Sequence, residues 1–350
     1  MPENRRKAAA LLKRLEPELV EQTLALVYAQ NPDMEARYGE YGKEKCRQDT
    51  HYHFSYLIES VGSGSSALFN DYVLWAQQVL ETRHLPVKDL HAHLGALKDV
   101  VTQNLPIDHY VLVANHLNSA LHVLEERHGL PPETEPILSD VAQQYLDFLL
   151  NGKRHQAIEL VLNEVEKGVP IKEIYLTVFQ AVQHQIGRLW QLNKISVAQE
   201  HFCTAATQWA MSQLYPQVFG SERNGLKLVS TCASGDLHEL GVRMVSDFFE
   251  MEGWDTYYLG SNVPVHSLLS ALRDQKPDLL LLSATMTYHV PAVEAAIEAV
   301  KKAQDLQDIK IMVGGYPFNT AEGLWQQVGA DGHSKNAQEA LELAQELIKK

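Results

Sequence analysis

Cysteine is scarce in this sequence. There are only three, Cys46, Cys203 and Cys232, and they lie far apart. An odd and scattered set excludes a disulfide framework and a clustered zinc motif. The N-terminal residues lack a long apolar stretch followed by a small-residue cleavage site, so no secretory signal is visible. Apolar runs are only a few residues long, far below the roughly 20 residues that a membrane span needs. We therefore expect a cytoplasmic protein with no membrane partner.

Positive charge is also in short supply. The chain has 44 acidic and 30 basic residues, which gives a net charge of −14. Binding to duplex nucleic acid depends on many Lys and Arg contacts to phosphate, so we expect no nucleic acid partner. The chain has 350 residues, of which 45% are hydrophobic, and this is enough for two or three domains with cores of their own.

The first 130 residues are predicted to be all-α, because apolar residues recur at helical spacing between breakers. The predicted helices are 8–30, 43–61, 66–80, 87–104 and 107–127. A segment rich in proline and acidic residues, 129–136, is the best linker. The helical pattern resumes at 137 and continues to about 220, with interruptions that predict a four-helix bundle. The predicted domains are residues 1–130, 137–220 and 225–350.

After residue 225, short apolar strands alternate with amphipathic helices. The predicted strands are 226–230, 255–259, 278–283, 310–313 and 330–333. The predicted helices are 239–252, 264–275, 290–303, 321–328 and 337–348. Strict alternation predicts a parallel sheet covered on both faces, which is a doubly wound, flavodoxin-like α/β domain.

Polar and glycine residues gather where the predicted strands end, which is where such sheets bind ligands. They are Asp236, His238, Gly241, Ser283, Thr285, Gly314 and Gly315. A neutral imidazole is a good ligand for a transition metal such as cobalt, and a nearby carboxylate can accept its other ring N–H. His238 is therefore the candidate metal ligand, and Asp236 the residue that fixes its tautomer. Taken alone, however, a loop histidine before a helix is more often a polar cap.

The pattern Asp-x-His-x-x-Gly at 236–241, with Ser-x-Thr at 283–285 and Gly-Gly at 314–315, resembles the cobalamin-binding domain of corrinoid proteins such as methionine synthase. That family usually has Ser-x-Leu where this chain has Thr285. The resemblance covers roughly residues 137–350. It implies a bound cobalamin whose cobalt is held from below by His238, with the nucleotide tail passing Ser283 and Gly314.

A second pattern lies in the helical region before the sheet, where Trp190 is followed after nine residues by Glu200 and His201. Asn193 predicts a helix end and residues 196–199 a capping box, so the three large side chains should converge on one spot. The pattern resembles light-responsive adenosylcobalamin-dependent repressors. This resemblance implies that Trp190 shields an adenosyl group, that Glu200 contacts it, and that His201 binds cobalt after light breaks the cobalt–carbon bond.

The N-terminal region holds nine of the sixteen histidines. Its densest polar stretch places Asp49, His53 and Tyr56 on one helical face. A helical domain before a photosensory cobalamin module resembles the photocobilins, which implies a globin-like fold and biliverdin as a second chromophore. Asp49, His53 and Tyr56 would then hydrogen-bond the tetrapyrrole. An equally weighted alternative is that these are surface and core histidines of a dimerising bundle.

Together these patterns predict a photoreceptor and not an enzyme. Its chromophore would be adenosylcobalamin in the dark, and it would signal as a homo-oligomer or through a separate partner. The alternative is a corrinoid methyl carrier of a methyltransferase system, which needs the His238 loop but not Trp190, Glu200 and His201. An adenosyl-dependent mutase ranks third, because no separate substrate barrel is visible.

Overall fold

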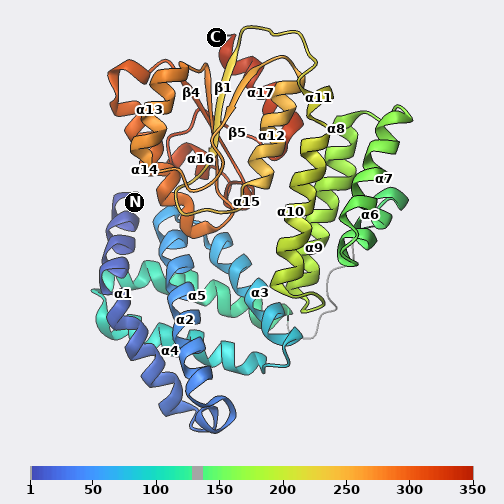
Figure 1. The fold of residues 1–350 in the computed structure, drawn as a ribbon. Coiled ribbons are helices and arrows are strands. Elements are labelled where there is room, and N and C mark those ends of the chain that lie inside the picture. Colours follow the sequence, from blue (N-terminus) through green and yellow to red (C-terminus); the bar gives the residue numbers. More distant parts are fainter. Residues whose placement is uncertain (1, 128–136, 350) are drawn as a thin grey trace. The chain divides into compact units, whose positions relative to one another are not determined.

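The computed structural model describes residues 2–127 and 137–349, and the chain forms two compact units, residues 1–132 and 133–350 (Figure 1). The predicted linker, 129–136, lies outside the described residues. Within the described part of the chain, no helix is long and apolar enough to cross a bilayer.

The first unit is helical, as predicted. Its helices are α1 (Pro2–Gln30), α2 (Asp33–Ser63), α3 (Ser66–Thr82), α4 (Val87–Asn104) and α5 (Ile107–Arg127). Two helices begin earlier than predicted, α1 at Pro2 and not at residue 8, and α2 at Asp33 and not at residue 43. Gly39 has a φ of +59° inside it, a backbone conformation that glycine adopts at little cost. The helix is therefore kinked at Gly39, in the part that lies before its predicted start.

The face of α2 that carries His53 and Tyr56 points into the core of this unit. His53 is 4% exposed, and its Nδ1 lies 2.8 Å from the hydroxyl of Tyr72 on α3. Tyr56 is also buried and stacks on the same tyrosine ring, with 3.8 Å between the centroids. Asp49 is exposed. The His53 ring packs edge-on against His93 of α4, whose Nε2 lies 2.9 Å from the Thr50 hydroxyl.

Buried histidines make the first unit acid-sensitive. Burial lowers the pKa of His93 from 6.5 to about 4, and lowers that of His116 equally. Between pH 4 and pH 6.5, the unfolded chain therefore binds more protons than the folded chain. Stability is therefore complete above pH 6.5 and falls as the pH drops, by roughly 2 kcal/mol per buried histidine at pH 5.

Hydrogen exchange of peptides from residues 2–127 in the full chain, measured from pH 7 to pH 5, checks this expectation. Replacing buried His93 with glutamine should flatten the pH dependence. The matched change at His122, whose side chain is 68% exposed, should leave the dependence unaltered. An identical pH profile for parent and His93→Gln would contradict the assignment.

The second unit begins with a helical region that we call the cap. Its helices are α6 (Asp140–Leu150), α7 (Arg154–Glu166), α8 (Ile171–Ile174), η1 (Tyr175–Gln180), α9 (Ala181–Gln191), α10 (Val197–Gln213) and α11 (Tyr215–Val218). A π-helical stretch, η1, joins α8 directly to α9. The predicted capping box at the start of α10 is confirmed, because the side chains of Ser196 and Gln199 bond each other's backbone N–H.

The rest of the second unit is the predicted parallel sheet, and its order β2-β1-β3-β4-β5 is that of a doubly wound fold. The strands are β1 (Lys227–Cys232), β2 (Asp255–Tyr258), β3 (Leu279–Ser283), β4 (Lys310–Gly314) and β5 (Gly332–His333). The main helices around it are α12 (Leu240–Met251), α13 (Val265–Gln275), α14 (Val290–Lys302) and α17 (Ala337–Ile348). Short helices η2 (Thr287–His289), η3 (Gln304–Leu306), α15 (Tyr316–Thr320) and α16 (Leu324–Gln327) lie in the connections.

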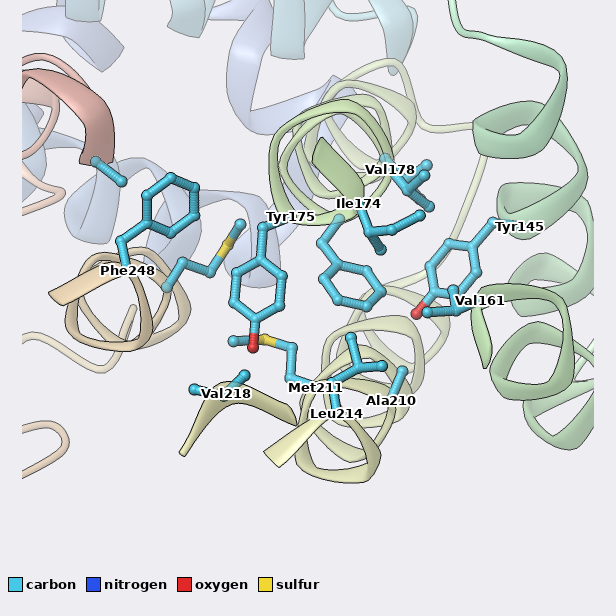
Figure 2. Close-up of a cluster of buried hydrophobic side chains, with 14 of the residues drawn as sticks. Tyr145, Val161, Ile174, Tyr175, Val178, Ala210, Met211, Leu214, Val218 and Phe248 are labelled. Carbon is cyan, nitrogen blue, oxygen red and sulfur yellow. The ribbon is translucent and has the colours of Figure 1, made fainter. Parts of the chain in front are cut away.

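Cap and sheet share one continuous hydrophobic core. In Figure 2 the labelled side chains form a row from Tyr145 of α6 past Tyr175 to Phe248 of α12. Tyr175 and Phe248 are at most 1% exposed, and their rings lie 6.1 Å apart. Burial of each such aromatic side chain contributes roughly 1.5–3 kcal/mol. The cap is therefore packed firmly against α12, the helix that directly follows the candidate ligand loop.

Candidate cobalamin site

Parallel pairing brings the ends of the central strands together. Cys232 of β1 is paired with Ser283 of β3, which in turn is paired with Gly314 of β4. The loops that follow these strands therefore open at one edge of the sheet, where the sequence predicts the ligand. Gly315 has a φ of +102°, and a Cβ atom there would lie 2.0 Å from the carbonyl oxygen of Ala284. The loops after β3 and β4 thus approach closely at a position that only glycine can occupy.

Asp236 and His238 interact as predicted for a ligand and its supporting carboxylate. The Nδ1 atom of His238 lies 2.8 Å from Oδ1 of Asp236, which also accepts the backbone N–H of His238 at 3.0 Å. The other oxygen, Oδ2, accepts the backbone N–H of Thr285 at 2.6 Å. Asp236 is fully buried, whereas the side chain of His238 is 59% exposed. No described residue bonds the Nε2 atom of His238, so this nitrogen is available to a ligand.

The electrostatics of the pair favour an ionised carboxylate. Burial opposes ionisation of Asp236, but hydrogen bonds from His238 and the Thr285 backbone, together with the nearby imidazole of His289, outweigh it and hold the pKa of Asp236 well below its usual range. The hydrogen bond to Asp236 raises the pKa of His238 against the opposing effect of burial, and the charge of Glu200 adds to the increase.

Sequence reasoning missed His289, although it closely follows the Ser-x-Thr segment. Its Nδ1 lies 3.3 Å from Oδ2 of Asp236, and its side chain is only 12% exposed. The carboxylate of Asp236 therefore lies between two imidazoles. Asn262, in the loop after β2, was missed as well, and its side-chain oxygen accepts the backbone N–H of Gly235 at 2.9 Å. Asn262 therefore holds the ligand loop by a hydrogen bond, and His289 lies beside the Asp236 carboxylate.

In the cap, Glu200 and His201 form a second carboxylate–imidazole pair in the first turn of α10. Oε2 of Glu200 is hydrogen-bonded to Nδ1 of His201, and its other oxygen accepts the hydroxyl of Thr204 at 3.0 Å. The side chain of His201 is 74% exposed. Trp190, at the end of α9, is half-buried against the core. This pair repeats at α10 the arrangement that Asp236 and His238 form before α12.

The residues at this edge fit a corrinoid. An imidazole with a free Nε2 and a carboxylate behind it is a suitable donor set for cobalt. Two large apolar side chains nearby are exposed, Leu237 at 70% and Tyr316 at 53%, and a flat hydrophobic ring would cover such groups. A Cβ atom at Gly241 would meet nothing within 4 Å, so there is open space beside the first turn of α12.

Replacing Asp236 with asparagine tests the electrostatics directly. The neutral amide removes the charge that favours imidazolium, so we expect the pKa of His238 to fall relative to the parent. Titration of the histidine ring resonances by NMR, in protein without corrinoid, measures the shift. The matched change Asp331→Asn, in the loop before β5, should leave that pKa alone. If the His238 pKa is the same in parent and Asp236→Asn, the assigned cause of its increase is wrong.

Comparison with known proteins agrees with the site. Two models of a B12 binding domain match the chain, one over residues 226–342 and the other over residues 141–215. Dimethylamine corrinoid protein 3 of Methanosarcina mazei is 31% identical over 140 residues, which are 40% of this chain and 81% of that protein. The protein of the same name from Methanosarcina acetivorans is 27% identical over 218 residues, 62% of this chain and 99% of its own length.

A solved structure agrees as well. The monomethylamine corrinoid protein of Methanosarcina barkeri matches 59% of this chain and 98% of its own length, with a TM-score of 0.54 and 23% sequence identity. This likeness shows a shared fold. Both B12 binding domain models match within the second unit. The globin-like fold predicted for the first unit stays a prediction.

These findings confirm cobalamin as the cofactor and correct the predicted function. The relatives are methylamine corrinoid proteins, so the photoreceptor interpretation is wrong, and the methyl-carrier alternative is favoured. The error has a clear origin. The prediction rested on the spacing of Trp190, Glu200 and His201, and that spacing alone does not identify the group bound to cobalt.

Proposed function

Because this chain belongs to the family of cobalamin-binding corrinoid proteins, we propose that it carries a methyl group on bound cobalamin for a separate methyltransferase. The observation that carries the proposal is the pairing of Asp236 with an exposed His238 at the carboxyl edge of the sheet. The relatives of the chain that are named methylamine corrinoid proteins support it. When bound, cobalamin supplies a cobalt centre that can accept and release a methyl group. The names of the relatives support a methylated amine as the donor.

In this proposal, His238 is the lower axial ligand, bound through Nε2. Asp236 keeps the ring proton on Nδ1 and thereby presents the lone pair of Nε2 to the metal. The backbone at Gly241, Gly314 and Gly315 leaves room for the corrin and its tail. Ser283 and Thr285 border the space that the tail would enter.

The cap residues would face the upper side of the corrin. Glu200 fixes the tautomer of His201 as Asp236 does for His238, and Trp190 limits access of water. We propose methyl, and not adenosyl, as the group on this side. His201 would be the residue that holds cobalt on this side when no methyl group is bound.

For the first unit we propose no cofactor. Binding of biliverdin stays a prediction, and the contacts of its expected ligands do not favour it. His53 and Tyr56 are buried and engaged with Tyr72, while Asp49 is exposed. A tetrapyrrole bound by all three would have to separate this cluster.

Methyl transfer in vitro tests the proposed function. The protein is loaded with cobalamin, reduced to the cobalt(I) state, and mixed with dimethylamine and a dimethylamine:corrinoid methyltransferase. We expect the spectrum of methylated cobalamin to appear at a rate that depends on all three components. The control is the same mixture with the His238→Ala variant. A loaded and reduced protein that takes no methyl group from mono-, di- or trimethylamine, each with its own methyltransferase, would contradict the proposal.

A further inference from the structure

A line of polar contacts crosses the largely apolar interface between the cap and α12. Glu239, Arg243 and Asp247 are spaced by four residues, so they lie along one stripe of α12 and its N-terminal flank. Each is bonded to a side chain of the cap. We call these contacts the polar seam.

The seam has three links. The Nε2 of Gln208 donates to Glu239 at 2.9 Å. Arg243 donates from Nε to the Tyr215 hydroxyl at 3.0 Å and from its NH2 group to the Ser212 hydroxyl at 2.9 Å. The third link is buried, since the hydroxyl of Tyr175 donates to Asp247 at 2.8 Å, and these two residues are 0% and 6% exposed.

The order of the links gives the direction of the two helices. Gln208 and then Ser212 of α10 bond Glu239 and then Arg243, so α10 and α12 run parallel along the seam, side by side in Figure 1. Their N-terminal ends therefore lie at the same end of the unit. His201 is in the first turn of α10, and His238 directly precedes α12.

The first link also sets an axial offset. Gln208 pairs with the residue next to His238, and it follows His201 by about two helical turns, or about 10 Å along α10. His201 is therefore displaced from His238 by about 10 Å along the common helix axis, in the direction that leads past the N-terminal end of α12. Such an offset leaves space between the two imidazoles for a flat ring.

Apolar packing alone would hold this offset weakly. Apolar contacts such as those of Phe248 with the cap are non-directional. One helix could shift along the other until its side-chain ridges fit the next set of grooves, and it would bury a similar area there. Hydrogen bonds to charged groups form in one register only, and fixing register is the best-supported role of buried polar groups.

We propose that the polar seam sets the axial register of the cap against the His238 loop, which makes Gln208, Glu239, Arg243 and Asp247 positioning residues for the upper face of the corrin. The proposal rests on the assignment of His238 as the cobalt ligand, but it does not require methyl transfer. Loosening the seam should expose the upper face while the lower ligand stays bound.

Association of the first cyanide measures access to the upper face. The protein is loaded with hydroxocobalamin in a His201→Ala background, so that the group displaced is water, and the rate is followed by absorbance. Gln208→Glu places one carboxylate against another at Glu239. We expect this change to raise the rate about tenfold, as the loss of one hydrogen bond to a charged group shifts an opening equilibrium by about that factor.

Exchanging the partners provides the rescue. Adding Glu239→Gln to Gln208→Glu restores an amide–carboxylate pair with the roles reversed, and we expect the rate to return close to that of the parent. Val161→Ala is the matched control, since it shortens a side chain that is 1% exposed in the same core and that takes no part in the seam hydrogen bonds. It should destabilise the unit without a change in cyanide association.

Three results would overturn the proposal: an unchanged rate in Gln208→Glu, a rate that the second change fails to restore, or an equal increase in Val161→Ala. If Gln208→Glu does not fold, Gln208→Leu removes the same link without adding charge and should also raise the rate. The experiment involves no methyl donor or methyltransferase. A failure of methyl transfer with the expected cyanide rates would therefore contradict the proposed function and leave the seam intact.

Discussion

Replacing His238 with alanine is expected to abolish cobalt ligation by the protein while the second unit stays folded. The side chain is 59% exposed, so little packing is lost. Removing only a partner that orients a ligand commonly weakens metal binding by about 10–100-fold, and removing the ligand itself should cost at least about 100-fold. Titration with cobalamin, followed by absorbance, gives the affinity and shows whether a histidine is bound to the metal.

The matched control is His333→Ala. This histidine also lies at the carboxyl edge of the sheet, but its Nε2 is 2.9 Å from the Asn319 side chain and it is not part of the Asp236 pair. We expect nearly parental affinity and an unchanged spectrum. If His238→Ala binds cobalamin as tightly as His333→Ala does, another residue holds the metal and the site must be reassigned.

Gly315→Ala is expected to have the largest effect on stability. Its φ of +102° costs an ordinary residue about 1–3 kcal/mol. The new Cβ would also lie 2.0 Å from the Ala284 oxygen, which is backbone and cannot rotate away. We expect the free energy of unfolding of the second unit to fall by about 3 kcal/mol or more, with loss of cobalamin binding.

The neighbouring glycine provides the comparison. A Cβ atom at Gly314 would lie 3.6 Å from the Ser334 oxygen, which is ordinary contact. Gly314→Ala should therefore change the free energy of unfolding by less than about 1 kcal/mol. Any loss of cobalamin binding in Gly314→Ala, without a loss of stability, would support its predicted position along the nucleotide tail. Equal stability of the two variants in denaturant titrations would show that the loops near Ala284 are not as tightly apposed as described.

The α/β domain was predictable because its signals are local. Four of its strands lie within a residue or two of their predicted ends, three of them as buried runs, and β5 is the weak strand that was expected near 330–333. The pairing of Asp236 with His238 also follows from sequence, since two residues in one short loop are bound to be neighbours. The role of Gly315 is likewise a local feature, because this glycine directly follows a strand.

What could not be predicted depends on residues far apart in the chain. His289 reaches Asp236 only because β1 and β3 are neighbours, and no short pattern shows that. The seam partners Tyr175 and Asp247 are 72 residues apart. The function was misjudged for a related reason, since the spacing of Trp190, Glu200 and His201 describes a helix pair and not the group above it. Names of relatives were needed to choose methyl transfer over light sensing.

Electron paramagnetic resonance of the cobalt(II) state tests the central claim most directly. Protein labelled uniformly with 15N is loaded with unlabelled cobalamin and reduced to cobalt(II), so that the lower nitrogen splits the cobalt lines. An imidazole of the protein gives doublets, which His238→Ala should abolish. Triplets from the 14N of the cofactor's own base, in protein with His238 intact, would contradict the account.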